Sequence, residues 1–167
     1  FGSCASLTSI EIPSTVTSLG HKAFADCTYL KTVSIPDGVS VIGDYAFSNC
    51  VCLSSVTLPE SLQTIGSYAF SNCSSLASII IPDGVTSIGD QTFYGCNGLK
   101  SITIPNGVEN IGNGTFESCK QIKKITIPNS VTSIGESAFG YCYDLANVTL
   151  GNGITSLSNL IFADCVI

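Results

Sequence analysis

The sequence predicts an α/β repeat protein in which short coils of equal length stack into one solenoid. Composition alone does not produce a strict internal spacing, so a repeat is the first signal to read. The eight phenylalanines of the 167-residue chain recur every 23 residues, at Phe1, Phe24, Phe47, Phe70, Phe93, Phe116, Phe139 and Phe162. The six prolines share another position of the repeat, at Pro13, Pro36, Pro59, Pro82, Pro105 and Pro128. We expect a single array over residues 1–167 with about seven coils.

The chain is predicted to be a fragment of a longer protein. It contains no methionine, and it begins with Phe1 in the middle of a repeat, in the same register as Phe162 near its end. Neither end carries a clear capping repeat, so each end is expected to present apolar surface.

Each coil is expected to contain a short strand. In residues 53–58, Val56 and Leu58 face one side because strand side chains alternate with a period of two. Ser55 and Thr57 then face the other side. Equivalent runs occur at residues 7–12, 30–35, 76–81, 99–104, 122–127 and 145–150. Since each strand recurs in the same direction one coil later, the strands should form a parallel sheet.

A turn and a second extended segment follow the strand. In residues 36–38, Pro-Asp-Gly favours a turn because Pro presets φ and Gly tolerates a positive φ. An apolar pair three residues apart comes next, such as Val85 and Ile88. We expect this segment to be extended or weakly strand-like.

A short helix or 3₁₀ turn is expected to complete the coil on the return side. The Ala-Phe-x-x-Cys pattern places Phe47 and Cys50 three residues apart, on one face of a helical turn. Polar residues of the types favoured at helix N-caps precede this pattern, at Asp44, Ser67, Asp90, Asn113 and Asn159.

The combined pattern Leu-x-x-Val-x-Leu-Pro-x-x-Leu-x-x-Ile-Gly-x-x-Ala-Phe-x-x-Cys resembles the 23-residue leucine-rich repeat of BspA-like surface proteins. The resemblance covers the whole chain. It implies a right-handed, curved leucine-rich-repeat solenoid with short parallel strands on the concave face, located at a cell surface or secreted. The departures are Thr92 and Thr115 in place of Ala, Ile122 in place of Leu and Ser158 in place of Gly. The family motif is structural and carries no catalytic residue.

Composition argues against several classes of function. The net charge is −6, with six lysines and no arginine, so the chain lacks the basic surface that nucleic acids require. No apolar run approaches the roughly 18 residues of a membrane span, so no membrane insertion by this segment is expected. His21 is the only histidine, in a solvent-facing slot, and no catalytic set accompanies it. We therefore predict no enzyme activity, no cofactor and no metal.

Cysteines form a second regular column. Eight of the nine recur every 23 residues, at Cys4, Cys27, Cys50, Cys73, Cys96, Cys119, Cys142 and Cys165. Stacked positions should lie about 5 Å apart, which admits a disulfide, but parallel Cβ vectors make the bond awkward. Free thiols in a small buried slot are the preferred prediction. Cys52 lies outside the column and should be exposed, either as a drifted loop residue or as a thiol that crosslinks chains.

The outward strand positions form the candidate partner-binding face. They are Thr32, Ser34, Ser55, Thr57, Ser78, Ile80, Ser101, Thr103, Lys124, Thr126, Asn147 and Thr149. The face is rich in hydroxyl groups, and Lys100, Lys123 and Lys124 add a local basic cluster. We predict a non-catalytic recognition or adhesion module that binds a protein or glycoconjugate here. The alternative is a structural module that self-assembles end to end, as a homo-oligomer, through its open ends.

The six tyrosines lie in variable slots and should be at least partly exposed. Tyr45 and Tyr68 occupy the same slot in adjacent coils, so their rings should stack. Scattered exposed aromatics usually carry no function, and we favour that interpretation over a set of interface anchors.

Overall fold

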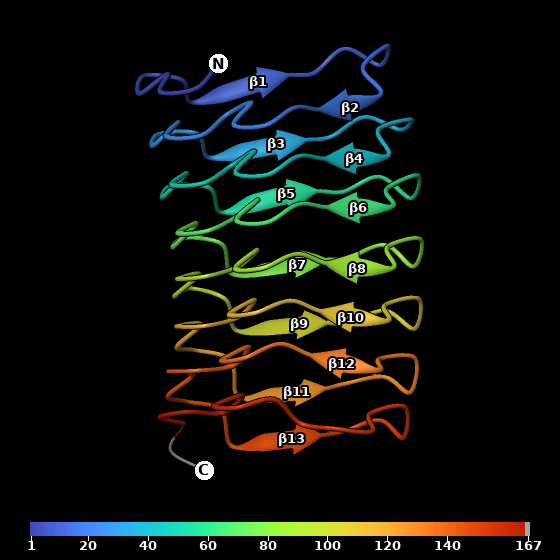
Figure 1. Ribbon diagram of the computed structural model, residues 1–167. Coiled ribbons are helices and arrows are strands. Elements are labelled where there is room, and N and C mark those ends of the chain that lie inside the picture. The colour runs from blue at the N-terminus through green and yellow to red at the C-terminus, as the bar shows by residue number, and fades with distance from the viewer. Residues whose placement is uncertain (166–167) are drawn as a thin grey trace.

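The computed structural model describes residues 1–165 and shows a flattened solenoid of stacked coils (Figure 1). The coils follow one another from the N-terminus at the top of the view to the C-terminus at the bottom. Each of the seven three-residue strands begins a coil, and in six of these coils a Pro-containing turn and a two-residue strand follow. A segment that we call the return arm, residues 43–50 in one coil, then leads to the next coil. No helix occurs within residues 1–165.

The three-residue strands alternate outward and inward side chains as predicted. They are β1 (Ser9–Glu11), β3 (Thr32–Ser34), β5 (Ser55–Thr57), β7 (Ser78–Ile80), β9 (Ser101–Thr103), β11 (Lys124–Thr126) and β13 (Asn147–Thr149). Pairing is parallel with a shift of one repeat, so that Val33 lies opposite Val56. The predicted parallel strands are confirmed.

The second segment of the coil forms a more regular sheet than expected. Its strands are β2 (Ser18–Leu19), β4 (Val41–Ile42), β6 (Thr64–Ile65), β8 (Ser87–Ile88), β10 (Asn110–Ile111) and β12 (Ser133–Ile134). They pair in the order β12-β10-β8-β6-β4-β2 as one six-stranded parallel sheet. In each strand the second residue is buried and packs into the core between the two layers.

The predicted short helix or 3₁₀ turn on the return side is wrong. In residues 43–50, Tyr45 and Asn49 have φ values of 58° and 61°, in the left-handed region that interrupts a right-handed helix. The alternation turns every second N–H group toward the next coil, while the N–H groups between them bond within the coil. Tyr45, Phe47 and Asn49 donate their N–H groups to the carbonyls of Ser67, Ala69 and Ser71, at 2.9, 2.7 and 2.8 Å. The return arm therefore uses these N–H groups to join coils, where a helix would use them internally.

The predicted helix N-caps also have a different role. The carboxylates of Asp44 and Asp90 accept hydrogen bonds from the backbone N–H groups of Ser67 and Asn113, at 2.8 and 2.7 Å. Each donor lies one repeat further along the chain. Ser67, Asn113 and Asn159 begin no helix either. Asp44, Asp90 and Asn113 instead accept a backbone N–H of the neighbouring coil, the last from Glu136 at 2.9 Å.

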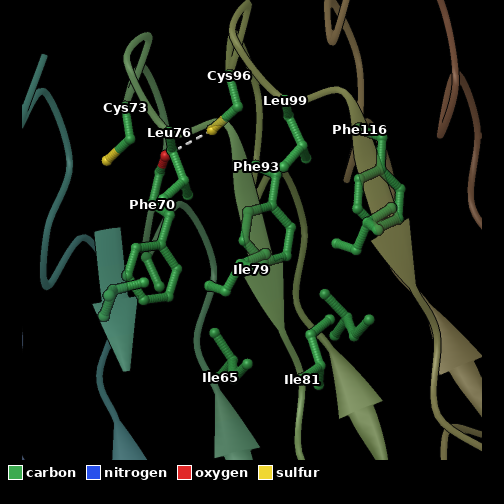
Figure 2. Close-up of a cluster of buried hydrophobic side chains, with 14 of the residues drawn as sticks. Ile65, Phe70, Cys73, Leu76, Ile79, Ile81, Phe93, Cys96, Leu99 and Phe116 are labelled. Carbon is green, nitrogen blue, oxygen red and sulfur yellow. Dashed lines mark hydrogen bonds between the residues drawn. The ribbon is translucent and has the colours of Figure 1, made fainter. Parts of the chain in front are cut away.

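A column of phenylalanine rings fills the core beside the return arms (Figure 2). Successive rings stack nearly parallel, with centroids 5.3 Å apart for Phe47 and Phe70 and 5.7 Å apart for Phe70 and Phe93. Both Phe70 and Phe93 are fully buried. The stack continues without a gap from Phe1 to Phe162. Offset aromatic stacking adds to the burial of each large side chain.

The cysteine column is buried as predicted, and its thiols also serve as hydrogen-bond donors. The Cys96 thiol lies 3.1 Å from the carbonyl oxygen of Phe70 in the preceding coil, the contact drawn in Figure 2. The same contact repeats from Cys27 to Cys165. These thiols are free, and only the end residues Cys4 and Cys165 are half-buried. Cysteine thus supplies a small apolar side chain that still donates to a buried carbonyl.

Burial of the cysteine column predicts a loss of stability at high pH. Burial raises the pKa of the Cys50, Cys96 and Cys142 thiols from 9.0 to about 12. The folded state holds these protons more tightly than the unfolded state does. Their stabilising contribution is therefore complete below pH 9.0 and is lost as the pH rises through the folded-state value of about 12. The free energy of unfolding, measured with urea at a series of pH values, should decline across this window.

The variant Cys96→Ala provides the control for this measurement. It should be less stable than the parent protein at neutral pH, but its stability should decline less steeply above pH 9. Tyrosine and lysine ionisation contributes equally to both proteins and cancels in the difference. Identical pH dependence of the two proteins would contradict a raised pKa for the Cys96 thiol.

Candidate functional site

The candidate site is the outward surface of the three-residue strands, which we call the strand face. The residues predicted to lie on this face are all exposed, because each alternates with the inward central residue of its strand. Ile80 is the most exposed large apolar side chain within residues 1–165, at 83%. The predicted placement of the face is therefore confirmed. Binding by these residues remains a prediction.

The strand face has two breaks in its hydrogen-bonded ladder. The seven strands divide into sheets β1-β3-β5, β7-β9 and β11-β13, so the described strands do not pair between β5 and β7 or between β9 and β11. At a paired junction, Lys100 donates its backbone N–H to the Ala77 carbonyl at 3.0 Å. Within residues 1–165, Lys123 forms no such bond to Lys100 across the second break. The bond that joins the equivalent backbone groups at a paired junction is therefore missing between Lys123 and Lys100.

A groove lies over the break between β9 and β11, and we call it the Lys124 groove. Its volume is about 520 Å³. Polar side chains line it: Ser101, Thr103, Lys124 and Thr126 from the strands, and Asp83 and Asn106 from the turns. Ile102, Ile104, Pro105 and Pro128 supply its apolar lining. The structure therefore brings four of the predicted site residues together around one hollow.

A second groove, of about 380 Å³, lies over the break between β5 and β7. Ser55, Thr57, Ser78 and Ile80 from the predicted face line it, together with Glu60. The remaining predicted residues are exposed on the same face, but they line neither groove: Thr32, Ser34, Asn147 and Thr149. The strand face is thus divided into local sites.

Two residues of the Lys124 groove were missed in the sequence. Asp83 and Asn106 follow Pro in the turn after a strand, where they were interpreted only as turn formers. The ends of parallel strands meet at one edge of a sheet, so the turns after β7 and β9 meet at that edge. Asp83 and Asn106 come shortly after outward strand residues, and this position could have indicated that they lie beside the strand face.

Positive charge gathers beside the Lys124 groove. Lys100 and Lys123 line an adjoining hollow of about 380 Å³ with Gln121 and Asp144. Together with Lys124, they place three of the six lysines on two neighbouring coils of a chain whose net charge is −6. This is the basic cluster expected from the sequence, and it lies along the edge of the strand face.

The other candidates form no site with the strand face. His21 is exposed and contacts the Tyr45 ring edge-on, with centroids 5.6 Å apart. Tyr45 stacks on Tyr68 at 4.6 Å, which confirms the predicted pair. Cys52 is half-buried, so the prediction of an exposed thiol is wrong; its backbone N–H is held by the Thr28 carbonyl at 3.2 Å.

The described part of the chain holds neither a cluster of metal-binding side chains nor a membrane-spanning helix. Residues 1–165 contain no group of three or more His, Cys, Asp or Glu side chains placed to hold a metal ion. Over the same residues, no helix has the length and apolar character needed to cross a membrane.

Three known bacterial structures have the same architecture. The chain is similar to a leucine rich repeat protein of T. pallidum, with 32% identity and a TM-score of 0.84, over 91% of this chain and 72% of that chain. It is similar to a leucine rich cell surface protein of Faecalibacterium prausnitzii, with 39% identity and a TM-score of 0.82, over 90% of this chain and 40% of that one. A leucine-rich repeat protein of Bacteroides ovatus is 26% identical, with a TM-score of 0.62, over 99% of this chain and 55% of that one.

The chain spans only part of these relatives, about half of the length or less in the second and third. A comparison with curated proteins finds no match. The family described as the BspA type leucine rich repeat region matches in six copies, over residues 1–82 and 41–167. Because these two matches together cover every residue, the chain belongs to the BspA-type leucine-rich repeat family.

Proposed function

We propose that this chain is a non-catalytic recognition module that binds a protein or glycoconjugate through the strand face. Leucine-rich repeats of the surface type are protein-interaction modules, and one structural neighbour is described as a cell surface protein. This neighbour supports placing the module at a cell surface or in a secreted protein. One observation carries the proposal. At each of the two breaks in the strand ladder there is a groove, and outward side chains that vary between coils line it.

The opposite face supports the proposal by contrast. The two-residue strands form an unbroken six-stranded ladder, so their backbone groups are paired from β2 to β12. A hollow of about 450 Å³ also lies along this ladder, bordered by Gly89, Gly112 and Gly135. It follows a column of glycines at which an added Cβ would meet the preceding coil, a feature of close stacking. The strand face has grooves that stacking does not explain.

Blocking the strand face should abolish binding. The double variant Thr57→Arg/Thr103→Arg places a long charged side chain in each groove. The matched control Thr64→Arg/Asn110→Arg changes exposed residues of the same coils on the opposite face. Each protein is tested against immobilised extracellular-matrix proteins and glycans. Every partner retained by the parent protein should be lost by the strand-face variant and kept by the control, whereas the reverse would place the site on the two-residue strands.

The second candidate function is end-to-end self-assembly, which the N-terminal end of the solenoid favours. Phe1 is 71% exposed, and an apolar hollow of about 440 Å³ lies beside it, bordered by Ile10, Val16 and Leu19. At the other end, Leu160 is 62% exposed. Either a further coil of the same chain or a second copy would cover such ends.

Sedimentation over a range of protein concentrations tests self-assembly. If copies stack through their apolar ends, the apparent mass should rise with concentration. Replacing Phe1 and Leu160 by Ser should then abolish the rise, because it removes apolar contact area from both ends. A mass that stays at the monomer value of 17.3 kDa at every concentration would exclude this function for the chain.

A further inference from the structure

We propose that the Lys124 groove binds a glycan through a carboxylated sugar, with the Lys124 ammonium group on the carboxylate and the groove's polar side chains on the sugar hydroxyls. The proposal rests on the proposed function, because it assumes that the strand face is the recognition surface. It adds the class of ligand, the groove that binds it and the residue, Lys124, that selects a negatively charged ligand.

The polar groups lining the groove suit a sugar. Ser101, Thr103 and Thr126 present hydroxyls that both donate and accept hydrogen bonds. Asp83 adds a carboxylate acceptor, and Asn106 adds an amide that donates and accepts. A sugar ring carries several hydroxyl groups that need partners of both kinds. The lining therefore offers a mixture that a simple anion would not use.

The apolar lining and the size of the groove also suit a sugar. Pro128 is half-buried and offers an apolar surface in the groove, and the small exposed parts of Ile102 and Ile104, at 8% and 4%, lie beneath the hydroxyl-bearing residues of the strands. A sugar ring has an apolar C–H face as well as hydroxyls, and burying it against these side chains is favourable. The volume of about 520 Å³ lies within the range of small-ligand sites, about 300–1,000 Å³.

The lysines beside the groove favour a sugar that carries a negative charge. Lys100, Lys123 and Lys124 lie on neighbouring coils at one edge of the groove, whereas Asp83 comes from a turn at the other end of the strands. Asp144 is the acidic group that shares the adjoining hollow with Lys100 and Lys123. A single carboxylate is therefore attracted to the lysine edge. The chain's overall charge of −6 repels a densely charged polyanion such as a nucleic acid.

A protein partner fits this groove less well. Protein interfaces depend on a few buried anchors, most often Trp, Tyr or Arg, and they cover about 800 Å² on each partner. The described strand face carries no aromatic residue, and the chain has no arginine. Ile80 is its only large apolar side chain, and it lines the other groove. The Lys124 groove offers polar contacts over a small area, as a sugar requires.

The test is titration of the ¹⁵N-labelled protein with sialyllactose, a carboxylated trisaccharide, followed by nuclear magnetic resonance. Lactose is the neutral probe, and a glutamate-rich peptide supplies carboxylates without sugar. The variant Lys124→Gln removes the charge from the groove. The control Lys31→Gln removes an exposed lysine from the same slot as Lys100 and Lys123, several coils away. Both side chains are exposed, so both variants should fold.

Sialyllactose should shift the backbone signals of Ser101, Thr103 and Thr126 and should bind more tightly than lactose. Lys124→Gln should weaken its binding by about threefold to fivefold, the upper part of the range for a solvent-exposed ion pair, and Lys31→Gln should leave it unchanged. Raising the ionic strength to about 1 M should remove the preference for the carboxylated sugar, because screening then acts over about 3 Å.

Three results would overturn the proposal. Equal weakening by Lys124→Gln and Lys31→Gln would indicate attraction to overall charge. Equal binding of the glutamate-rich peptide would show that the carboxylate is recognised without the sugar. Absence of any shift with sialyllactose would remove the sugar site. In each case the double arginine variant at Thr57 and Thr103 still tests the strand face independently, so the two failures can be told apart.

Discussion

The close approach of one coil to the next is the constraint on which this structure depends. A single coil has no helix and no hydrogen-bonded sheet of its own; apart from the short turn bonds within it, such as Cys50 N–H to the Phe47 carbonyl, its backbone groups find partners in its neighbours. Three ladders make these contacts: the strand face, the two-residue strands and the return arms. The ladder of two-residue strands fixes the spacing, and there Gly89 packs against the backbone of Ser67 and Gly66. Each coil is therefore stable only as part of a stack.

The side-chain columns follow from the same spacing. Once equal positions lie one above another, Phe rings stack, thiols reach the carbonyls of the preceding coil, and Asp44 reaches the N–H of Ser67. Thr92 and Thr115, which stand where the repeat has Ala, also bond across this spacing to the preceding coil. Their hydroxyls lie 3.1 Å from the carbonyls of Gly66 and Gly89 in the preceding coil. Both threonines are fully buried, and this contact satisfies their polar atoms.

Period-two alternation was enough to predict the strands, their buried residues and the exposed strand face, because each follows from side-chain direction within a few residues. It was not enough for the return arm. The spacing of Phe47 and Cys50 suits a helical turn and also a chain of turns with left-handed residues such as Tyr45, and only contacts with the next coil decide between them. The ladder breaks were also unpredictable, since Ser101 and Lys124 occupy ordinary strand positions. The grooves depend on backbone pairing between coils, which side-chain patterns do not encode.

Stacking also separates the residues that specify the fold from those available for recognition. Inward positions repeat because each must match the same position one coil away. Outward positions of the strand face contact no core, so Ile80 and Lys124 can stand where other coils have Thr and Ser. Recognition by this chain therefore has to come from the positions that vary between coils.

One pair of substitutions tests the stacking constraint most directly. A Cβ at Gly89 would lie 2.7 Å from the Ser67 backbone nitrogen, whereas a Cβ at Gly20, in the same slot of the first coil, meets nothing within 4 Å. Thermal unfolding should therefore show a clear loss of stability for Gly89→Ala, about 1–3 kcal/mol as for other overpacked sites. Gly20→Ala should be neutral or slightly stabilising. Equal stability of the two variants would contradict the claim that close backbone stacking determines this fold.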